Sequence, residues 1–594
     1  MGKSEAAERA ERFGVRSWAA SRRYGWLFSL ALIVACGRTE QDGKGSNPPG
    51  GSAGSGVAGA NGGGGYGANS GASGTGAAGH GAGTGGECAM RPLASRQLVR
   101  LSFEQIGESL EELLGAELAA PIREQFSLVN PAFFPALDAP SEGQKINEPV
   151  FAKSDSIAQA AGAAVLDHFE ELTGCAGTAT DACAEEFLTS FAERAFRRPL
   201  ARDERDNVLQ VYTEAKALGA SLQLAVSTAV QAIFDSPLFL YRTEFGSDDP
   251  GASDVALDAY ELASALSFFL TNRPPDAALL EAAEQGALAD EQQLADQVER
   301  LIASDAGRAH LQQGLFDALL APRVDGAVFD PALFPAFTDT LRAAMREETW
   351  SVLGGVVAGA PLRDLLLSRT SRVNAELAEL YAVDFPPAGA AVDRRGFAAV
   401  TLPDERSGVL THATFLSGSS RPDSASIIGR GLWVYNQLLC GPLIPSPPVL
   451  VEDVIGIPEG MNAQQAAEYR MATTPCNGCH QLIDPYGLAL HSFDAIGAAH
   501  MAPLTVTLPA LAGEREVTGA AELAQAIADS GRFEACVTSH FLRAALTYGE
   551  RIPVDDCTVQ SVVGERAADL DLARVASAIA RSRAFAVRST EGAP

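Results

Sequence analysis

The chain has 594 residues, of which 46% are hydrophobic, and 74 acidic residues against 45 basic ones give it a formal net charge of −29. A chain of this length and hydrophobicity can bury a large core, and usual domain sizes predict three or four folding units. The negative charge would repel phosphates and anionic headgroups. We therefore expect no nucleic acid as partner and no docking to membranes through basic residues.

The first 36 residues have the pattern of an export signal. Arginines precede an apolar run at 26–35, and Ile33-Val34-Ala35-Cys36 stands at its end. The run is too short to span a bilayer as a mature helix. The tetrapeptide resembles a bacterial lipobox, so we predict a lipoprotein signal peptide at 1–36 and lipidation of Cys36. The alternative is an ordinary signal peptide in which the cysteine stands by chance.

Residues 37–86 are nearly all small or polar, with many glycines. This composition cannot bury enough apolar surface to offset its ordering entropy, so we predict a disordered linker with a reach of roughly 40 Å. The linker would tether the folded part to a membrane through the lipid anchor. We expect a location in the cell envelope, facing the periplasm or the cell surface. Gly37 does not resemble a retention signal, which favours the outer membrane.

From Cys88 onward, helical patterns follow one another between short segments rich in Gly, Pro and Asp. Ser102 and Gln105 form a capping box. Another helix ends before Pro199, because proline disfavours helical geometry in the preceding residue. Further helices are predicted at 221–234, 257–270, 290–304, 334–353 and 520–546, and strands only at 397–402 and 504–508. The fold class is therefore mainly α, with few short strands.

One segment carries recognisable chemistry: Cys476-Asn477-Gly478-Cys479-His480 is the chain's Cys-x-x-Cys-His sequence. This is the attachment pattern of c-type haem. Two thiols on one turn can add to the two haem vinyl groups, and the next residue presents an imidazole to the iron. We predict one covalent haem c bound through Cys476 and Cys479, with His480 as proximal iron ligand, and a preceding helix at 462–472.

Three other interpretations of the motif stay open. A zinc site would need more ligands, and Cys440 or a distant histidine would have to supply them. A redox disulfide would favour a strand-to-helix setting, whereas a helical pattern precedes this motif. The third interpretation is a chance match in a long chain.

The second axial ligand of the iron is not fixed by the motif. We rank Met501 first as the candidate distal ligand, ahead of His500 and His491. Further candidates are Met461, Met471 and His540. Asp484 is expected to accept the free N–H of the proximal imidazole. Pro485 and Gly487, which follow it, indicate a turn, and Phe493 is expected near the porphyrin edge.

The nine cysteines fit an oxidising compartment, since removing Cys36 and the haem pair leaves six. We predict a Cys175–Cys183 disulfide and a Cys536–Cys557 disulfide, because each closes a short loop between predicted helices. A Cys88–Cys440 pair follows by elimination. The alternative is that some of these residues are buried free thiols.

The sequence around the haem motif resembles a known family. Ile483-Asp484-Pro485 with Gly487, followed by Phe493-Asp494 with Gly497, is similar to the haem-motif domain of large exported planctomycete and myxobacterial proteins. Those proteins are built from consecutive domains of unknown function, numbered 1587, 1595, 1592, 1588 and 1585. Segment 98–115 is similar to the first, 195–200 to the second, 236–242 and 263–270 to the third, and 533–537 and 582–585 to the last. Arg406 and the pair Arg430-Gly431 lead into the haem domain.

The resemblance implies helical domains at 87–180, 181–248 and 249–390, a small cytochrome c-like haem-binding domain at 400–505 and a C-terminal helical domain at 512–590. Two departures stand out, His491 in place of an acidic residue and Gly549-Glu550-Arg551 in place of Gly-Arg. The family has no assigned reaction, so the resemblance gives no substrate.

The leading functional hypothesis is electron transfer with a redox partner protein. An extracytoplasmic haem enzyme of oxidase or peroxidase type is the second, because one axial position can be open. The third is an envelope polymer-binding or scaffold protein with a structural haem.

Overall fold

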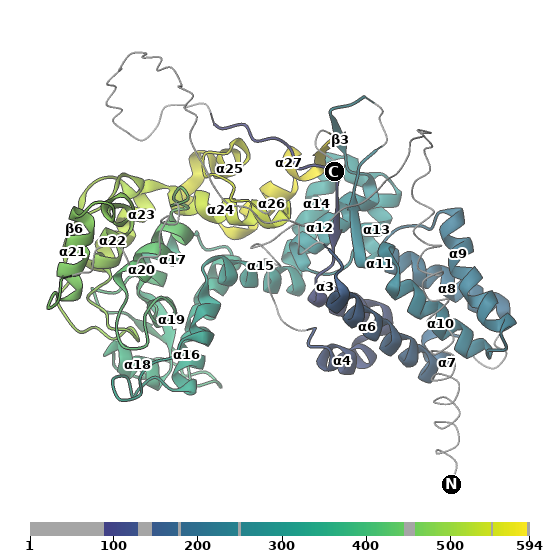
Figure 1. Cartoon of the computed structure of the whole chain (residues 1–594), viewed down its shortest axis with the longest axis horizontal. Coiled ribbons are helices and arrows are strands. Elements are labelled where there is room, and N and C mark those ends of the chain that lie inside the picture. The colour runs from purple at the N-terminus through teal and green to yellow at the C-terminus, as the bar shows by residue number, and fades with distance from the viewer. Residues whose placement is uncertain are drawn as a thin grey trace, which may run out of the picture. The chain divides into compact units, whose positions relative to one another are not determined.

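The computed structural model describes residues 88–128, 145–175, 180–247, 251–444, 458–547 and 550–590. The signal peptide, Cys36, the linker at 37–86 and Gly549 lie outside them. The described chain is mainly α, as predicted, and belongs to one compact unit (Figure 1). Within it, no helix is long and apolar enough to cross a membrane.

The first group of helices surrounds one hydrophobic cluster. Helix α10 packs against α6, α8 and α9 and buries Val226, Val230 and Ile233 among them. The elements of this group are β1 (Gln97–Arg100), α3 (Phe103–Leu114), α4 (Ala116–Gln125), α6 (Glu148–Asp167), α7 (Phe169–Thr173), α8 (Asp181–Phe196), α9 (Arg202–Ala217), α10 (Leu222–Asp235), α11 (Pro237–Leu240) and β2 (Tyr241–Glu244).

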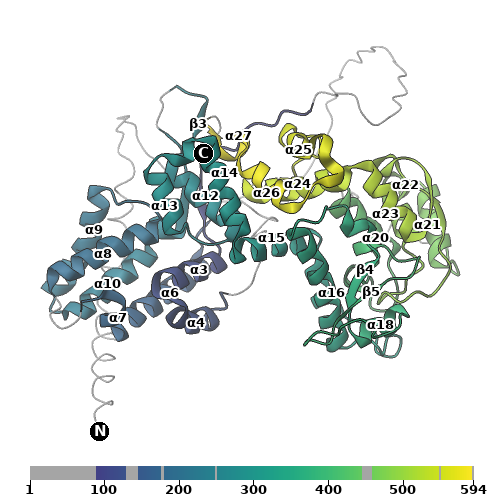
Figure 2. The same cartoon turned by 180° about the vertical axis from the view of Figure 1, so that it is seen from behind.

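The middle of the chain continues as helices with three short strands. Helix α16 contacts α18 and β4, and these lie together in Figure 2. The elements are β3 (Asp254–Ala256), α12 (Ala259–Thr271), α13 (Ala277–Glu284), η1 (Ala287–Ala289), α14 (Glu291–Ala303), α15 (Asp305–Ala318), η2 (Ala321–Gly326), α16 (Asp339–Val357), α17 (Asp364–Leu367), β4 (Thr370–Val373), α18 (Ala375–Tyr381) and β5 (Ala398–Thr401).

The last part contains the Cys-x-x-Cys-His segment, at the start of α22. Its elements are η3 (Gly408–Thr411), α19 (Ala413–Gly418), α20 (Ile427–Trp433), η4 (Val434–Leu438), α21 (Ala463–Ala472), α22 (Asn477–Ala489), β6 (Thr505–Thr507), η6 (Ala510–Ala512), β7 (Glu516–Thr518), α23 (Gly519–Ser530), α24 (Arg532–Ala545), α25 (Cys557–Val563), η7 (Gly564–Asp569), α26 (Leu572–Ala580), α27 (Arg583–Ala586) and β8 (Val587–Ser589).

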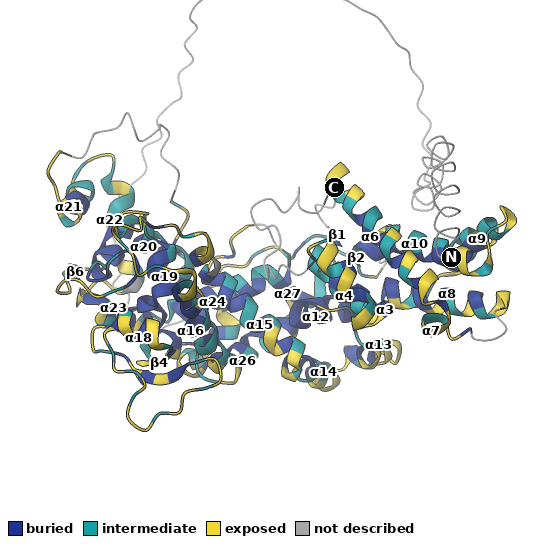
Figure 3. Ribbon diagram, turned by 90° about the horizontal axis from the view of Figure 1, so that it is seen from below, coloured by how far each residue is buried: buried dark blue, intermediate teal, exposed yellow. Residues whose placement is uncertain are grey.

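The largest hydrophobic cluster extends from Leu257 to Phe585 and includes residues of three predicted domains. Figure 3 shows buried residues along the facing sides of these helices and exposed ones mainly on outer turns. Segments 249–390, 400–505 and 512–590 therefore share one core.

The strands form two-stranded antiparallel pairs, β1 with β2, β3 with β8, β4 with β5 and β6 with β7. The β3–β8 pair joins segments far apart in sequence, with Val255 opposite Arg588. The strands predicted at 397–402 and 504–508 are confirmed as β5 and β6.

The predicted helix starts are confirmed where a capping residue marks them. Ser102 and Gln105 form the capping box of α3, and α8 ends at Arg197 in left-handed geometry. The single helix predicted at 520–546 is wrong, because Gly531 adopts a φ of 65° and separates α23 from α24. Glycine tolerates that geometry at low cost.

Of the predicted disulfides, only Cys175–Cys183 is present. The other two pairings are wrong, because Cys88 bonds Cys557 and Cys440 bonds Cys536. Chain segments distant in sequence bring these thiols together. The N–H of Cys557 donates to the carbonyl of Ala89, and Arg532 on α24 donates to the carbonyl of Leu439. Loop length therefore misled the pairing prediction.

Candidate haem-attachment site

The Cys-x-x-Cys-His segment forms the first turn of α22. Cys476 is the N-cap residue, and the N–H of His480 donates to its carbonyl at 3.0 Å. The preceding helix α21 is capped by Asn462, within a residue of the predicted start, and packs against α22 (Figure 1). One turn thus presents both thiols and the imidazole.

A buried carboxylate orients the His480 ring. Nδ1 of His480 lies 3.0 Å from Oδ1 of Asp484, one turn further along α22. Two nitrogens of Arg470 on α21 bind the other oxygen of Asp484, at 3.0 and 2.9 Å. Asp484 is fully buried and paired with a cation, so it acts as an acceptor. Nδ1 therefore carries the proton, and Nε2 keeps its lone pair for a metal.

The two motif cysteines are half-buried and are the free cysteines of the described residues. The other six form disulfides. Cys440 is one of those six, so it is not free to complete a zinc site. Two free thiols one turn apart, beside an imidazole with an open Nε2, are the donor set that haem c requires. The residues present therefore fit a haem.

A group of polar side chains lies on the Cys479 side of α22. Tyr486 follows Cys479 by two helical turns, and its buried hydroxyl has no partner in the described part of the chain. Burial raises the pKa of Tyr486, while the Arg532 charge acts in the opposite direction. Burial also raises the pKa of Tyr435, which lies within electrostatic range of Cys479. A bound group with acceptor oxygens, such as the haem propionates, would satisfy the Tyr486 hydroxyl.

Glycines bring α22 close to α20. A Cβ atom on Gly487 would stand 1.9 Å from the carbonyl oxygen of Ile427, and one on Gly431 would stand 2.2 Å from that of Ile483. The turn predicted at Asp484-Pro485 is wrong, because α22 continues through Pro485. Proline costs a hydrogen bond inside a helix. Packing against α20 offsets that cost.

A buried arginine holds the C-terminal end of α22. Arg430 on α20 donates to the carbonyls of Leu490 at 2.9 Å and of Phe493 at 2.6 Å, and also to that of Asp494. These carbonyls would otherwise lack partners in the core. Phe493 is fully buried, and the guanidinium of Arg406 lies 4.8 Å from its ring centroid. Phe493 therefore packs at the far end of α22 from the cysteines and not beside them.

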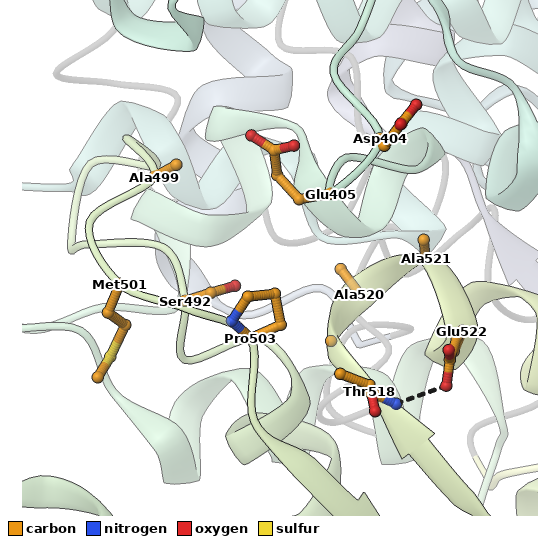
Figure 4. A pocket seen from close by; sticks show the side chains of 11 residues that line it. Asp404, Glu405, Ser492, Ala499, Met501, Pro503, Thr518, Ala520, Ala521 and Glu522 are labelled. Atoms are coloured by element: carbon orange, nitrogen blue, oxygen red, sulfur yellow. Dashed lines mark hydrogen bonds between the residues drawn. The ribbon is translucent and has the colours of Figure 1, made fainter.

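The structure does not bring Met501 to His480. The N–H of His500 donates to the carbonyl of Ser492, beyond the end of α22. That end, at Ala489, lies about 14 Å along the helix axis from His480, at 1.5 Å per residue. Met501 instead lines a separate cavity with Ser492 and Pro503 (Figure 4).

The other distal candidates are scattered. His491 and His500 face one another at the same far end, with ring centroids 6.0 Å apart. His540 lies beside the Cys440–Cys536 disulfide, with Nε2 3.6 Å from each sulfur. Met461 precedes α21 and Met471 lies in its last turn, and Gln481 on α22 donates to the Met471 carbonyl. Of the six, Met471 is nearest in sequence to the motif and contacts α22 through this hydrogen bond.

Family models match three segments of the chain. They are the protein of unknown function DUF1595 (PSD5) at residues 183–244, DUF1592 (PSD4) at 257–383 and DUF1588 (PSCyt3) at 406–502. These matches agree with the resemblance of the three segments to the domains of unknown function 1595, 1592 and 1588. The DUF1588 match contains Arg406, Arg430 and the whole Cys-x-x-Cys-His turn. Segment 236–242, which we assigned to DUF1592, lies in the DUF1595 match. No curated protein and no solved structure matches the chain.

The sequence indicated the thiols, His480 and Asp484, but not Arg470, Tyr486 or the anchoring role of Arg430. Arg470 is on a different helix from Asp484, 14 positions earlier. Contacts between side chains on two different helices have no fixed spacing in sequence, so the sequence did not indicate this one. A charged residue in the otherwise apolar pattern of α20 was the available signal for Arg430.

Proposed function

We propose that this DUF1588 protein binds one haem c covalently through Cys476 and Cys479, with His480 as proximal ligand, and that it transfers electrons. A haem bound there would supply one-electron transfer. The observation that carries the proposal is the hydrogen-bonded series from Arg470 through Asp484 to His480, placed directly beside two free thiols. Such a series is the usual support of a metal-binding histidine.

The residues of the site have distinct tasks in this proposal. Cys476 and Cys479 fix the cofactor, so that it cannot be lost outside the cytoplasm. Asp484 holds the His480 ring and increases the electron donation of Nε2, which stabilises the oxidised iron. The thiols are half-buried and the His480 side chain keeps 19% of its surface exposed. A redox partner protein would therefore approach the first turn of α22.

The proposed location is the cell envelope, with a lipid anchor at Cys36. The oxidising compartment is supported by three disulfides, since such bonds persist in extracytoplasmic proteins. Mass spectrometry of the membrane fraction would test the anchor, and an unmodified Cys36 thiol would contradict it.

A pyridine haemochrome spectrum tests the cofactor. The full chain is produced with cytochrome c maturation machinery and compared with the Cys476→Ala, Cys479→Ala variant. We expect a c-type band that survives denaturing electrophoresis and disappears in the variant. Folded protein without haem would overturn the proposal.

A haem enzyme is the second candidate, because Met501 lies away from His480. An open axial position would let the iron react with peroxide or dioxygen. A five-coordinate ferric spectrum that changes with cyanide would favour this candidate. A six-coordinate low-spin spectrum unchanged by cyanide would favour electron transfer. The third hypothesis, an envelope scaffold with a structural haem, predicts unchanged envelope binding after His480→Ala.

A further inference from the structure

A cavity of about 520 Å³ lies beyond the C-terminal end of α22, away from the Cys-x-x-Cys-His turn. Three segments line it: the Asp404-Glu405 loop after β5, the stretch from Ser492 to Pro503, and the start of α23 (Figure 4). Gly519 closes one side, because a Cβ atom there would stand 2.7 Å from the side chain of Pro503. The volume is in the range of small-molecule sites.

The charged residues of the wall are all acidic: Asp404, Glu405 and Glu522. Asp404 is paired with Arg369, which is outside the wall, at 2.5 Å. Glu522 accepts the N–H of Thr518 at 2.7 Å and so offsets the partial positive charge at the start of α23. Glu405 is exposed and forms no ion pair among the described residues, so no salt bridge balances its charge, and its carboxylate points away from Ser492 in Figure 4.

A buried hydroxyl points into the same cavity. Ser492 is 3% exposed, and its Oγ has no hydrogen-bond partner in the part of the chain that the structure describes. In Figure 4, this oxygen points from its loop toward the space beside Ala520, below Glu405. A buried hydroxyl without a partner is costly, and a ligand with N–H groups would remove that cost.

Apart from Thr518, the remaining side chains of the wall are apolar: Ala499, Met501, Pro503, Ala520 and Ala521. A bare metal ion does not suit this arrangement. Among the described residues, Cys440, Cys536 and His540 are the set of potential metal ligands that converges on one point, and the cavity carboxylates are not among them. A cation with an apolar body would meet both the carboxylate and the apolar wall.

We propose that this cavity binds a primary alkylammonium group. The ammonium donates to the Ser492 hydroxyl, lies in the negative potential of Glu405, and places its alkyl chain against Met501, Pro503 and Ala521. The site is independent of the haem and of the electron-transfer proposal.

Calorimetric titration of the full chain at pH 7 tests the site with three probes of equal length: n-hexylamine, n-hexanol and n-hexanoate. We expect n-hexylamine to bind at least about tenfold more tightly than the other two, and to bind more weakly in high salt. Equal affinity for n-hexanol would show that the cavity selects only for apolar chains, and would overturn the proposal. Tighter binding of n-hexanoate would overturn it in favour of an anion site at α23.

Variants assign the contacts. Glu405→Gln is expected to weaken n-hexylamine about tenfold and Ser492→Ala about threefold. The matched control is Glu516→Gln, which removes an exposed charge on β7 outside the cavity and should change affinity less than twofold. Unchanged affinity in Glu405→Gln would overturn the proposal. Should Ser492→Ala fail to fold, Ala521→Leu fills the cavity from its partly exposed wall and must abolish binding.

Discussion

Helix α10 is capped by Ser221, whose side chain accepts the Leu224 N–H, and it buries an apolar face against α6, α8 and α9. Helix α22 has nearly the same length, but no side chain caps its N-terminus and it contains Pro485. It also carries the charged side chain of Asp484, which is buried in the protein. Apolar burial fixes the first helix. Close backbone contact and buried arginines fix the second, which leaves its first turn open for thiols and an imidazole.

The difference between α10 and α22 shows which contacts stabilise a helix that carries reactive residues. The first turn of α22 contributes little apolar burial, because Cys476, Cys479 and His480 are only partly buried. The support lies further along, at Gly487 and at the carbonyls bound by Arg430. The chemistry and the anchoring are thus at opposite ends of the same helix.

The strongest way to break this arrangement is Gly487→Ala. The added methyl group would overlap the Ile427 carbonyl, and α20 and α22 would have to separate. We expect a loss of about 4 kcal/mol in the free energy of unfolding, measured by denaturant titration. The control is Gly478→Ala on the same helix, where the methyl group meets nothing within 4 Å. That variant should gain up to about 1 kcal/mol, and equal losses in both would contradict the close-contact explanation.

Arg430→Met should have the next largest effect. It removes the donors from the carbonyls of Leu490, Phe493 and Asp494 in a buried setting. The expected loss is about 3 kcal/mol, again from denaturant titration. Arg581→Met, which breaks an exposed pair with Glu291, should cost less than about 1 kcal/mol. A small effect of Arg430→Met would mean that water replaces the guanidinium.

Asp484→Asn sharpens the comparison at the reactive end. It keeps an acceptor for His480 but removes the negative charge that Arg470 balances. In haem-loaded protein we expect the midpoint reduction potential to rise by tens of millivolts, because His480 becomes a weaker donor. Spectroelectrochemical titration measures the shift. The matched control is Glu468→Gln, an exposed charge on neighbouring α21, and an equal shift there would point to general charge and not to the hydrogen bond.

The smallest effect concerns acid stability. Burial lowers the pKa of His310 to about 3, and burial together with the charges of Arg543 and Arg551 lowers that of His540 to about 4. Both histidines protonate near pH 6.5 when unfolded, so the unfolded state binds more protons between pH 6.5 and these values. Stability is therefore full above pH 6.5 and falls as the pH decreases through that window.

His310→Gln tests this pH dependence. Between pH 6 and 4, the slope of unfolding free energy against pH should decrease by up to about 1.4 kcal/mol per pH unit. Denaturant titrations at a series of pH values measure it. An unchanged slope would show that His310 is already charged in the folded protein.

The same contrast explains what the sequence could predict. Periodicity and capping residues identified α10 and the start of α3, because the information is local. The Asp484 acceptor was predictable because it lies one turn from His480. Pro485 and Gly487 misled us, since their local preference for a turn was overridden by contact with α20. Arg470 and the Cys440–Cys536 pair depend on contacts between distant segments, which a single sequence does not reveal.

The Cys88–Cys557 disulfide has a consequence for how the chain is assembled. Its two cysteines are 469 positions apart, and β8, which pairs with β3, follows still later. Cys88 therefore keeps a reactive thiol until Cys557 has been synthesised. Four other disulfide-forming cysteines and the haem-motif pair are synthesised in that interval. During this interval wrong partners are available, so production of the correctly bonded protein should depend on a disulfide isomerase.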